Sequence, residues 1–132
     1  MNQPEILIVG AGGMGALFGS ILHENGLKVV LYDTNTEHIR AIQQVGLKIE
    51  GYGGDRTIPI AATSNLSELE SAEIIIFQCK SHGTRQASKA VKPLITQESV
   101  CISFQNGLGN EEVMAEELGN DFVMGGLTAM AG

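Results

Sequence analysis

The fold is decided by residues 5–33, which read EILIVGAGGMGALFGSILHENGLKVVLYD. A short apolar run comes first, followed by glycines spaced Gly10-x-Gly12-x-x-Gly15, a segment of helical length and a second apolar run ending at Asp33. This order predicts a strand, a phosphate-binding turn, a helix and a second strand closed by an acid. Because all these parts agree, we favour a dinucleotide site over a plain glycine-rich turn.

Each part of this motif has a physical role if a dinucleotide binds there. Gly10 allows a tight exit from the strand, Gly12 lets the backbone approach a pyrophosphate, and Gly15 lets the helix pack close to the sheet. The unpaired N–H groups at the start of the helix and the positive end of its dipole face the phosphates. The predicted cofactor-binding residues of the turn are Gly10, Ala11, Gly12, Gly13, Met14 and Gly15.

Asp33 is the acid of the motif. It lies about 20 residues beyond the glycines, where a carboxylate can accept hydrogen bonds from an adenosine ribose. We therefore include Asp33 among the predicted cofactor-binding residues.

Length and charge limit the classes of protein that fit. The chain has 132 residues, enough for one domain with its own core, and a net charge of −7. An acidic chain lacks the basic face that a nucleic acid or an anionic membrane surface needs. The apolar runs are too short for a membrane span and residues 1–5 show no secretory signal, so we expect a cytoplasmic protein.

Other motifs that carry chemistry are few. The sequence has no HExxH, GxSxG or Walker pattern, so hydrolase and kinase functions lack support, and no spacing of ligand residues predicts a metal site. Cys79 and Cys101 lie in or after apolar runs without CxxC spacing. We therefore expect both to be buried thiols.

Beyond Asp33 the chain alternates helices with strands. This alternation predicts a Rossmann-type α/β fold, an open, mostly parallel, twisted sheet with helices on both faces. Pro59 suits an edge strand, because it cannot donate a backbone hydrogen bond. The expected elements are a helix capped by 34–36 and ending before Gly46, a hairpin of 47–50 and 57–61, a short helix opened by Ser67 and Glu70, strands at 73–79, 99–104 and 122–126, a helix at 84–91 and a helix capped by Asn110 and ending at Gly119.

Polar residues follow the expected central strands, at the sheet edge where such folds bind ligands. Lys80 can place an ammonium against a nucleotide phosphate or ribose, although a solvated loop lysine fits equally well. His82 fits a solvated histidine better than an acid or a base. Asn106 offers a donor and an acceptor to a ligand, but a plain turn explains it too. Thr128 is either a hydroxyl ligand or an ordinary strand residue.

Basic residues recur at helical spacing in the helix expected at 84–91 and just beyond it. Arg85, Lys89 and Lys92 form either a phosphate-facing stripe or a solvated outer face, and the apolar residues on the other side of the helix favour the solvated face. We expect His23 and His38, which lie in other helices, to be surface residues.

Four segments carry a family resemblance: residues 6–19 (ILIVGAGGMGALFG), Cys79-Lys80, residues 105–110 (QNGLGN) and residues 125–128 (GGLT). Together they resemble the amino-terminal half of the ketopantoate reductase (2-dehydropantoate 2-reductase) family. The resemblance covers the whole chain, and QNGLGN is far more specific than the glycine turn. It makes Lys80 and Asn106 expected cofactor-binding residues.

The resemblance implies that residues 1–132 form the dinucleotide-binding domain of a larger enzyme, cut near the interdomain junction. In such enzymes a nicotinamide cofactor gives a hydride to the ketone of a 2-oxo acid, while a lysine from a helical second domain protonates the oxygen. That lysine is not among these residues, so we expect weak cofactor binding and no turnover. The resemblance puts Lys80 at the adenosine-phosphate side and Asn106 near the nicotinamide or the substrate.

Asp33 departs from the family pattern. Members that prefer NADPH carry an arginine near the end of the second strand, where this chain has Asp33-Thr34-Asn35. A carboxylate repels a 2′-phosphate and suits the free ribose diol of NAD(H). We therefore expect NAD rather than NADP, which leaves the particular 2-oxo acid open.

A free-standing nucleotide-sensing domain without catalysis is the alternative function. Such a sensor would need neither QNGLGN nor the apolar residues 127–132. A helical domain encoded beyond Gly132 would support the reductase, and a stop codon would support the sensor. The expected partners of the reductase are a nicotinamide dinucleotide, a small 2-oxo acid and, in the full-length protein, a second copy forming a homodimer.

Overall fold

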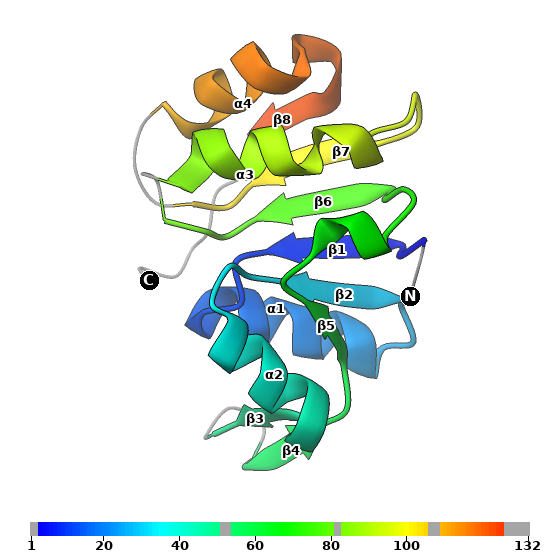
Figure 1. Ribbon diagram of the computed structural model, residues 1–132, viewed down its shortest axis with the longest axis vertical. Helices are drawn as coiled ribbons and strands as arrows, with labels where there is room; N and C mark the ends of the chain where they lie inside the picture. The colour runs from blue at the N-terminus through cyan, green and yellow to red at the C-terminus, as the bar shows by residue number, and fades with distance from the viewer. Residues whose placement is uncertain (1–2, 51–53, 81–82, 106–108, 126–132) are drawn as a thin grey trace.

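The computed structural model describes residues 3–50, 54–80, 83–105 and 109–125 (Figure 1). Its centre is a six-stranded sheet in the order β5-β2-β1-β6-β7-β8, in which every neighbouring pair is parallel. The strands are β1 (Ile6–Val9), β2 (Val29–Tyr32), β5 (Ala61–Thr63), β6 (Ile74–Phe77), β7 (Val100–Ser103) and β8 (Val123–Gly125). The predicted Rossmann-type sheet is therefore confirmed.

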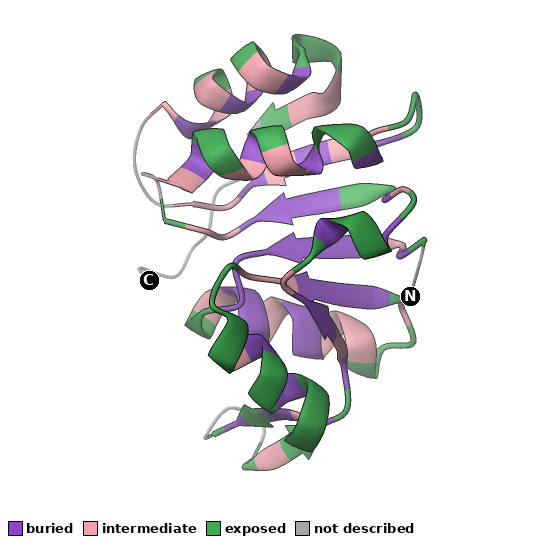
Figure 2. Ribbon diagram, viewed as in Figure 1, coloured by how far each residue is buried: buried purple, intermediate pink, exposed green. Residues whose placement is uncertain are grey.

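Helices cover both faces of this sheet, as the alternation predicts. The α-helices are α1 (Gly13–Glu24), α2 (Thr36–Val45), α3 (Thr84–Val91) and α4 (Asn110–Leu118). Short 3₁₀ helices, η1 (Leu66–Glu68), η3 (Lys92–Leu94) and η4 (Asn120–Phe122), lie between the main elements. Figure 2 shows the buried residues concentrated in the strands and on the inner sides of the helices.

The apolar run of β1 explains why the core has two halves. All four residues of β1 are buried, because successive side chains of a strand point to opposite faces and both faces are covered. Ile6 and Ile8 pack in one cluster with α1 and α2, and Leu7 and Val9 pack in the other with α3 and α4. The strand that leads into the glycine turn is thus fixed from both sides.

The predicted hairpin exists, but its second strand is shorter than expected. β3 (Leu47–Ile49) pairs antiparallel with β4 (Arg56–Ile58) in a separate two-stranded sheet. The predicted strand 57–61 breaks at Pro59, which has no N–H to continue a ladder. The chain then joins the main sheet as β5, parallel to β2.

Two helix caps also differ from the prediction. η1 is capped by Asn65, whose side chain accepts from the Ser67 N–H at 3.1 Å, so the predicted capping role of Ser67 is wrong. At α4 the cap position is held by Gly109 with φ of 87°. Asn110 is the first helical residue, and its buried side chain accepts a hydrogen bond from Thr84 at 3.0 Å. The predicted cap of α2 is confirmed, because Asn35 accepts from the His38 N–H at 3.1 Å.

Candidate functional site

A cleft of about 1140 Å³ lies at the carboxyl ends of the central strands. The chain passes from β1 to β2 on one side and later returns to β6 on the other, so the strand order reverses between β1 and β6. Ligands of open α/β sheets bind at such a switch point. The lining includes the predicted site residues Gly10, Gly12, Gly13, Met14, Asp33 and Lys80.

Gly10 is the position where the turn most plainly requires glycine. Its φ is +108°, and a Cβ would lie 2.6 Å from the Cys79 nitrogen and 2.7 Å from the Gln78 carbonyl carbon. The backbone leaving β6 therefore packs directly against the turn after β1. The tight exit predicted for Gly10 is confirmed, and the close approach of β6 adds a second reason for glycine.

The remaining glycines divide into packing positions and open positions. A Cβ on Gly15 would lie 1.9 Å from the Gly10 carbonyl oxygen and 3.3 Å from the side chain of Ile8 in β1, so the predicted close packing of α1 against the sheet is confirmed. At Gly12 and Gly13 a Cβ would meet nothing within 4 Å among the described atoms. Gly12 and Gly13 both line the cleft, so they leave room for a ligand to approach the backbone.

The start of α1 supplies hydrogen-bond donors to this open space. Gly12 occupies the cap position and has no side chain to cap the helix, and the first turn contains no acidic residue. The first helical bond runs from the Ala16 N–H to the Gly12 oxygen at 2.8 Å, so the N–H groups before Ala16 have no intrahelical partner. Donors of this kind at a helix N-terminus fit an anionic pyrophosphate.

Asp33 is anchored to the glycine turn. One carboxylate oxygen accepts from the Ala11 N–H at 2.8 Å and the other from the Asn35 N–H at 2.9 Å. Each oxygen has a second lone pair, so the carboxylate can accept further hydrogen bonds on the cleft side. Ala11 itself is 1% exposed and supports the turn from beneath.

His38 bonds to the carbonyl group of Ala11, whereas Asp33 bonds to its N–H. Its Nε2 lies 2.7 Å from the Ala11 carbonyl oxygen, and because a carbonyl only accepts, Nε2 carries the hydrogen. The side chain is half-buried, so the expectation of a plain surface histidine is wrong. The sequence offered one signal, since His38 lies in the first turn of the helix that follows Asp33.

A polar network joins the ends of β6 and β7. Gln105 Nε2 donates to the Cys79 carbonyl oxygen at 2.9 Å and to Thr84 Oγ1 at 2.7 Å. Thr84 in turn donates to Asn110, and Ser103 donates to Gln105 Oε1 at 2.9 Å. None of the sequence motifs predicted this network, and its one signal was the position of Gln105 directly after an expected central strand.

The other predicted site residues have different outcomes. Lys80 is exposed and lines the cleft, three residues after the end of β6, because this strand stops at Phe77 and not at Cys79 as predicted. Asn106, His82 and Thr128 lie outside the described residues. Arg85 is on the solvated side of α3 and pairs with Glu116 at 2.8 Å and Glu117 at 2.6 Å, which agrees with the predicted outer face.

The two cysteines differ in exposure. Cys101 is 0% exposed, and burial raises the pKa of its thiol to about 11. Cys79 is only half-buried and lines the cleft, so the expectation of full burial is wrong there. Burial is also the main cause that raises the pKa of Cys79. Both thiols are therefore weak nucleophiles at neutral pH.

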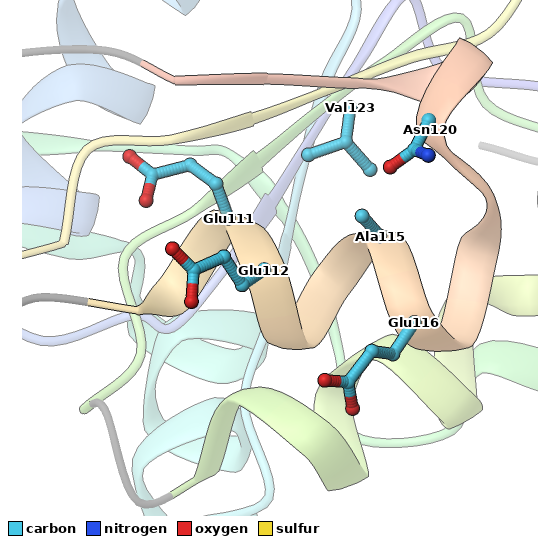
Figure 3. Close-up of a pocket in the computed structure, with 6 residues that line it drawn as sticks. All are labelled: Glu111, Glu112, Ala115, Glu116, Asn120 and Val123. Atoms are coloured by element: carbon cyan, nitrogen blue, oxygen red, sulfur yellow. The ribbon is translucent and has the colours of Figure 1, made fainter.

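A second cavity of about 560 Å³ lies between α4 and β8 (Figure 3). Its lining includes Glu111, Glu112 and Glu116, whose negative charges would repel a pyrophosphate. We therefore place the candidate site in the cleft at β1 and β6. Within the described ranges, no group of three His, Cys, Asp or Glu side chains suits a metal ion, and no helix has the length and apolar character of a membrane span.

Comparison with known proteins agrees with the family suggested by the sequence motifs. The model of the family described as ketopantoate reductase PanE/ApbA matches residues 6–132. The chain belongs to this family. Ketopantoate reductase relatives include a 2-dehydropantoate 2-reductase of Pyrococcus abyssi, 36% identical over 124 residues, and one of Lactococcus lactis, 31% identical over 126 residues. Each match covers 94% of this chain but only 39% and 40% of the respective relative.

Solved structures share the fold of this chain. A PanE/ApbA family ketopantoate reductase from Ralstonia eutropha matches with a TM-score of 0.82 at 29% identity, over 92% of this chain and 40% of that one. A D-mandelate dehydrogenase, solved with NADH and anilino(oxo)acetate, matches with a TM-score of 0.84 at 26% identity, over 96% of this chain and 41% of that one. The chain thus spans about two fifths of the length of these relatives.

Proposed function

We propose that this chain is the nicotinamide-dinucleotide-binding part of a 2-oxo acid reductase. The observation that carries the proposal is the anchoring of Asp33 to the Ala11 N–H at 2.8 Å, beside a turn whose Gly12 and Gly13 face open space. This arrangement puts a carboxylate next to a set of free helix N–H groups, which suits a ribose and a pyrophosphate. When bound, the cofactor supplies a hydride for reduction of a ketone.

Different residues along the cleft would bind different parts of the dinucleotide. The backbone donors of Gly13 and Met14 would hold the pyrophosphate, and Asp33 would accept from the adenosine ribose. Lys80 would add a positive charge on the phosphate side, and Asn106 would contact the nicotinamide or the substrate. The general-acid lysine of the reaction would come from outside residues 1–132.

NAD(H) is the cofactor that we propose. The segment Asp33-Thr34-Asn35 supplies a carboxylate and no cation at the end of β2. The two backbone N–H groups bonded to Asp33 fix this carboxylate, so it cannot easily turn away from a 2′-phosphate. Support also comes from the D-mandelate dehydrogenase named above, whose structure holds NADH.

Titration of NADH and NADPH into the chain tests this proposal. We expect saturable binding of NADH and at least about tenfold weaker binding of NADPH, which corresponds to about 1.4 kcal/mol. Tighter binding of NADPH would contradict the cofactor assignment. Absence of binding by either nucleotide would contradict the proposed function as a whole.

A separate assay tests the expected division between domains. NADH oxidation is followed with ketopantoate and with other 2-oxo acids, using the 132-residue chain and the full-length protein in parallel. We expect turnover only in the full-length protein. We also propose that the full-length protein is a homodimer and that it acts in the cytoplasm. Reduction of ketopantoate by the chain alone would overturn the view that the acid lysine lies elsewhere.

A further inference from the structure

Two glutamines line the cleft just after neighbouring strands, and they differ in their hydrogen bonds. Gln105 uses its side-chain N–H groups on the Cys79 carbonyl and on Thr84. Gln78 Nε2 is shielded from solvent, yet it has no hydrogen-bond partner among the residues that the structure describes. The two side chains have the same chemistry, so the difference lies in what surrounds them.

An unpaired buried donor destabilises the free protein. The amide loses its hydrogen bonds to water and gains none in return, whereas an apolar side chain of the same size would avoid this cost. Most buried polar groups in folded proteins are paired, and an unpaired one calls for a specific explanation. Because Gln78 lines the cleft, a bound ligand is the partner that could complete its hydrogen bonding.

The backbone fixes Gln78 beside the glycine turn. Its N–H donates to the Val9 oxygen at 2.7 Å, and its carbonyl carbon lies 2.7 Å from where a Cβ of Gly10 would be. Gln78 therefore sits at the switch point between β1 and β6.

The strand order indicates which part of a dinucleotide would reach Gln78. Asp33 follows β2, the glycine turn follows β1 and Gln78 follows β6, in the order of the strands across the sheet. A dinucleotide with its adenosine ribose at Asp33 and its pyrophosphate at the start of α1 extends next over β6. Its nicotinamide half, which begins with the second phosphate and ribose, would then meet the free amide.

We propose that Gln78 is a cofactor-binding residue whose side-chain N–H donates a hydrogen bond to an oxygen in the nicotinamide half of the dinucleotide. The inference rests on the proposed function and adds a contact outside the glycine turn. A donor is the right chemistry there, because phosphate and ribose oxygens accept hydrogen bonds.

The test replaces Gln78 by methionine, which keeps the length of the side chain and removes the donor. Gln44→Met, on the exposed side of α2, is the matched control. The affinities of NADH, ADP-ribose and AMP are measured for the 132-residue chain and both variants, together with the melting temperature of the free proteins. ADP-ribose retains the second phosphate and ribose, whereas AMP ends before them.

We expect Gln78→Met to weaken NADH and ADP-ribose about five- to tenfold and to change AMP affinity less than about twofold. The melting temperature of the free variant should equal or exceed that of the parent chain, because an unpaired buried amide has been removed. Gln44→Met should match the parent chain in all measurements. A residue with a purely structural role would instead lower the melting temperature and weaken all three ligands together.

Three outcomes would overturn the inference. Unchanged NADH affinity in Gln78→Met would show that the amide makes no contact, while the proposed function would stand. Equal losses for AMP and NADH would place the contact at the adenosine or assign Gln78 a structural role. Failure of the parent chain itself to bind NADH would refute the proposed function and this inference with it.

Discussion

The backbone N–H of Ala11 donates to Oδ2 of Asp33 at 2.8 Å, and this bond makes the glycine turn and the acid after β2 one unit. The acid therefore has two tasks. It holds the turn in the free protein, and it presents the carboxylate on which our choice of NAD(H) depends. A substitution at Asp33 should affect both stability and cofactor preference.

Asp33→Asn should lower the free energy of unfolding by about 1–3 kcal/mol, because an amide can accept from only one of the two backbone N–H groups. The same variant should weaken NADH binding and narrow its advantage over NADPH, since the negative charge is gone. Urea unfolding and titration with both nucleotides measure the two effects. Asp121→Asn, at an exposed position on η4, serves as the control and should change neither.

Substitutions at Gly12 and Gly15 should have different effects, the first on NADH affinity and the second on stability. Gly15→Ala places a Cβ 1.9 Å from the Gly10 oxygen, so α1 must shift and stability should fall by about 2 kcal/mol or more. Gly12 has φ of −74°, which alanine adopts readily, and its Cβ would meet nothing within 4 Å. Gly12→Ala should thus keep the melting temperature and lose NADH affinity. If Gly12→Ala bound NADH as the parent chain does, the pyrophosphate would not lie at this turn.

His38 should stabilise the turn through its hydrogen bond to the Ala11 carbonyl. His38→Phe keeps a ring but cannot donate, so we expect the free energy of unfolding to fall by about 1 kcal/mol. His38→Gln retains a donor of similar reach and should recover part of the loss. Urea unfolding of both variants checks this prediction, and equal stabilities for the two would show that the bond to Ala11 contributes nothing.

Cys101 should make stability depend on pH in the alkaline range. Burial raises the pKa of its thiol from 9.0 to about 11. The contribution of this thiol to the free energy of unfolding is fully present below the pKa of the unfolded chain. It is lost as the pH rises through the pKa of the folded protein, because between the two values only the unfolded chain releases the proton. Between about pH 8 and about pH 10 the free energy of unfolding should fall by about 1 kcal/mol from this group.

Urea unfolding at several pH values measures this slope, and Cys101→Ala is the comparison. The variant should be less stable overall, because it leaves a small cavity, but its stability should fall less with pH. Parallel slopes for the two proteins would mean that Cys101 does not carry the effect.

Cys79 should report on occupancy of the cleft. It is half-buried and lines the cleft, whereas Cys101 is fully enclosed, so a thiol reagent should modify Cys79 first. The reaction should speed up as pH rises, because burial raises the pKa of Cys79 and the thiolate is the reactive form. NADH should slow the modification, and equal rates with and without NADH would contradict its binding beside Cys79.

The sequence was sufficient to predict the features that depend on local pattern. The apolar run of β1, the glycine spacing and the acid at Asp33 each have a direct physical meaning, and they led to the correct sheet and to residues that line one cleft at its edge. The cap at Asn35 and the solvated face of Arg85 were likewise readable from neighbouring residues.

Contacts between distant segments could not be predicted in this way. His38 meets Ala11, and Gln105 meets Thr84, only because the strands bring their loops to the same edge of the sheet. Asn110 is a residue type that often caps helices, but here its side chain is buried and accepts a hydrogen bond from Thr84. The unpaired Nε2 of Gln78 could not be predicted from the sequence, because it depends on the absence of a hydrogen-bond acceptor around it among the described residues.

The most direct test of the central claim is a ¹H–¹⁵N correlation spectrum of the chain during titration with NADH. We predict that the amide signals of Gly12, Gly13 and Met14, together with that of Asn35 beside Asp33, shift progressively and saturate. Signals from the acidic cavity, such as those of Glu112 and Asn120, should stay in place. A spectrum that does not change, or one in which only the signals of the acidic cavity move, would contradict the claim that this cleft binds the dinucleotide.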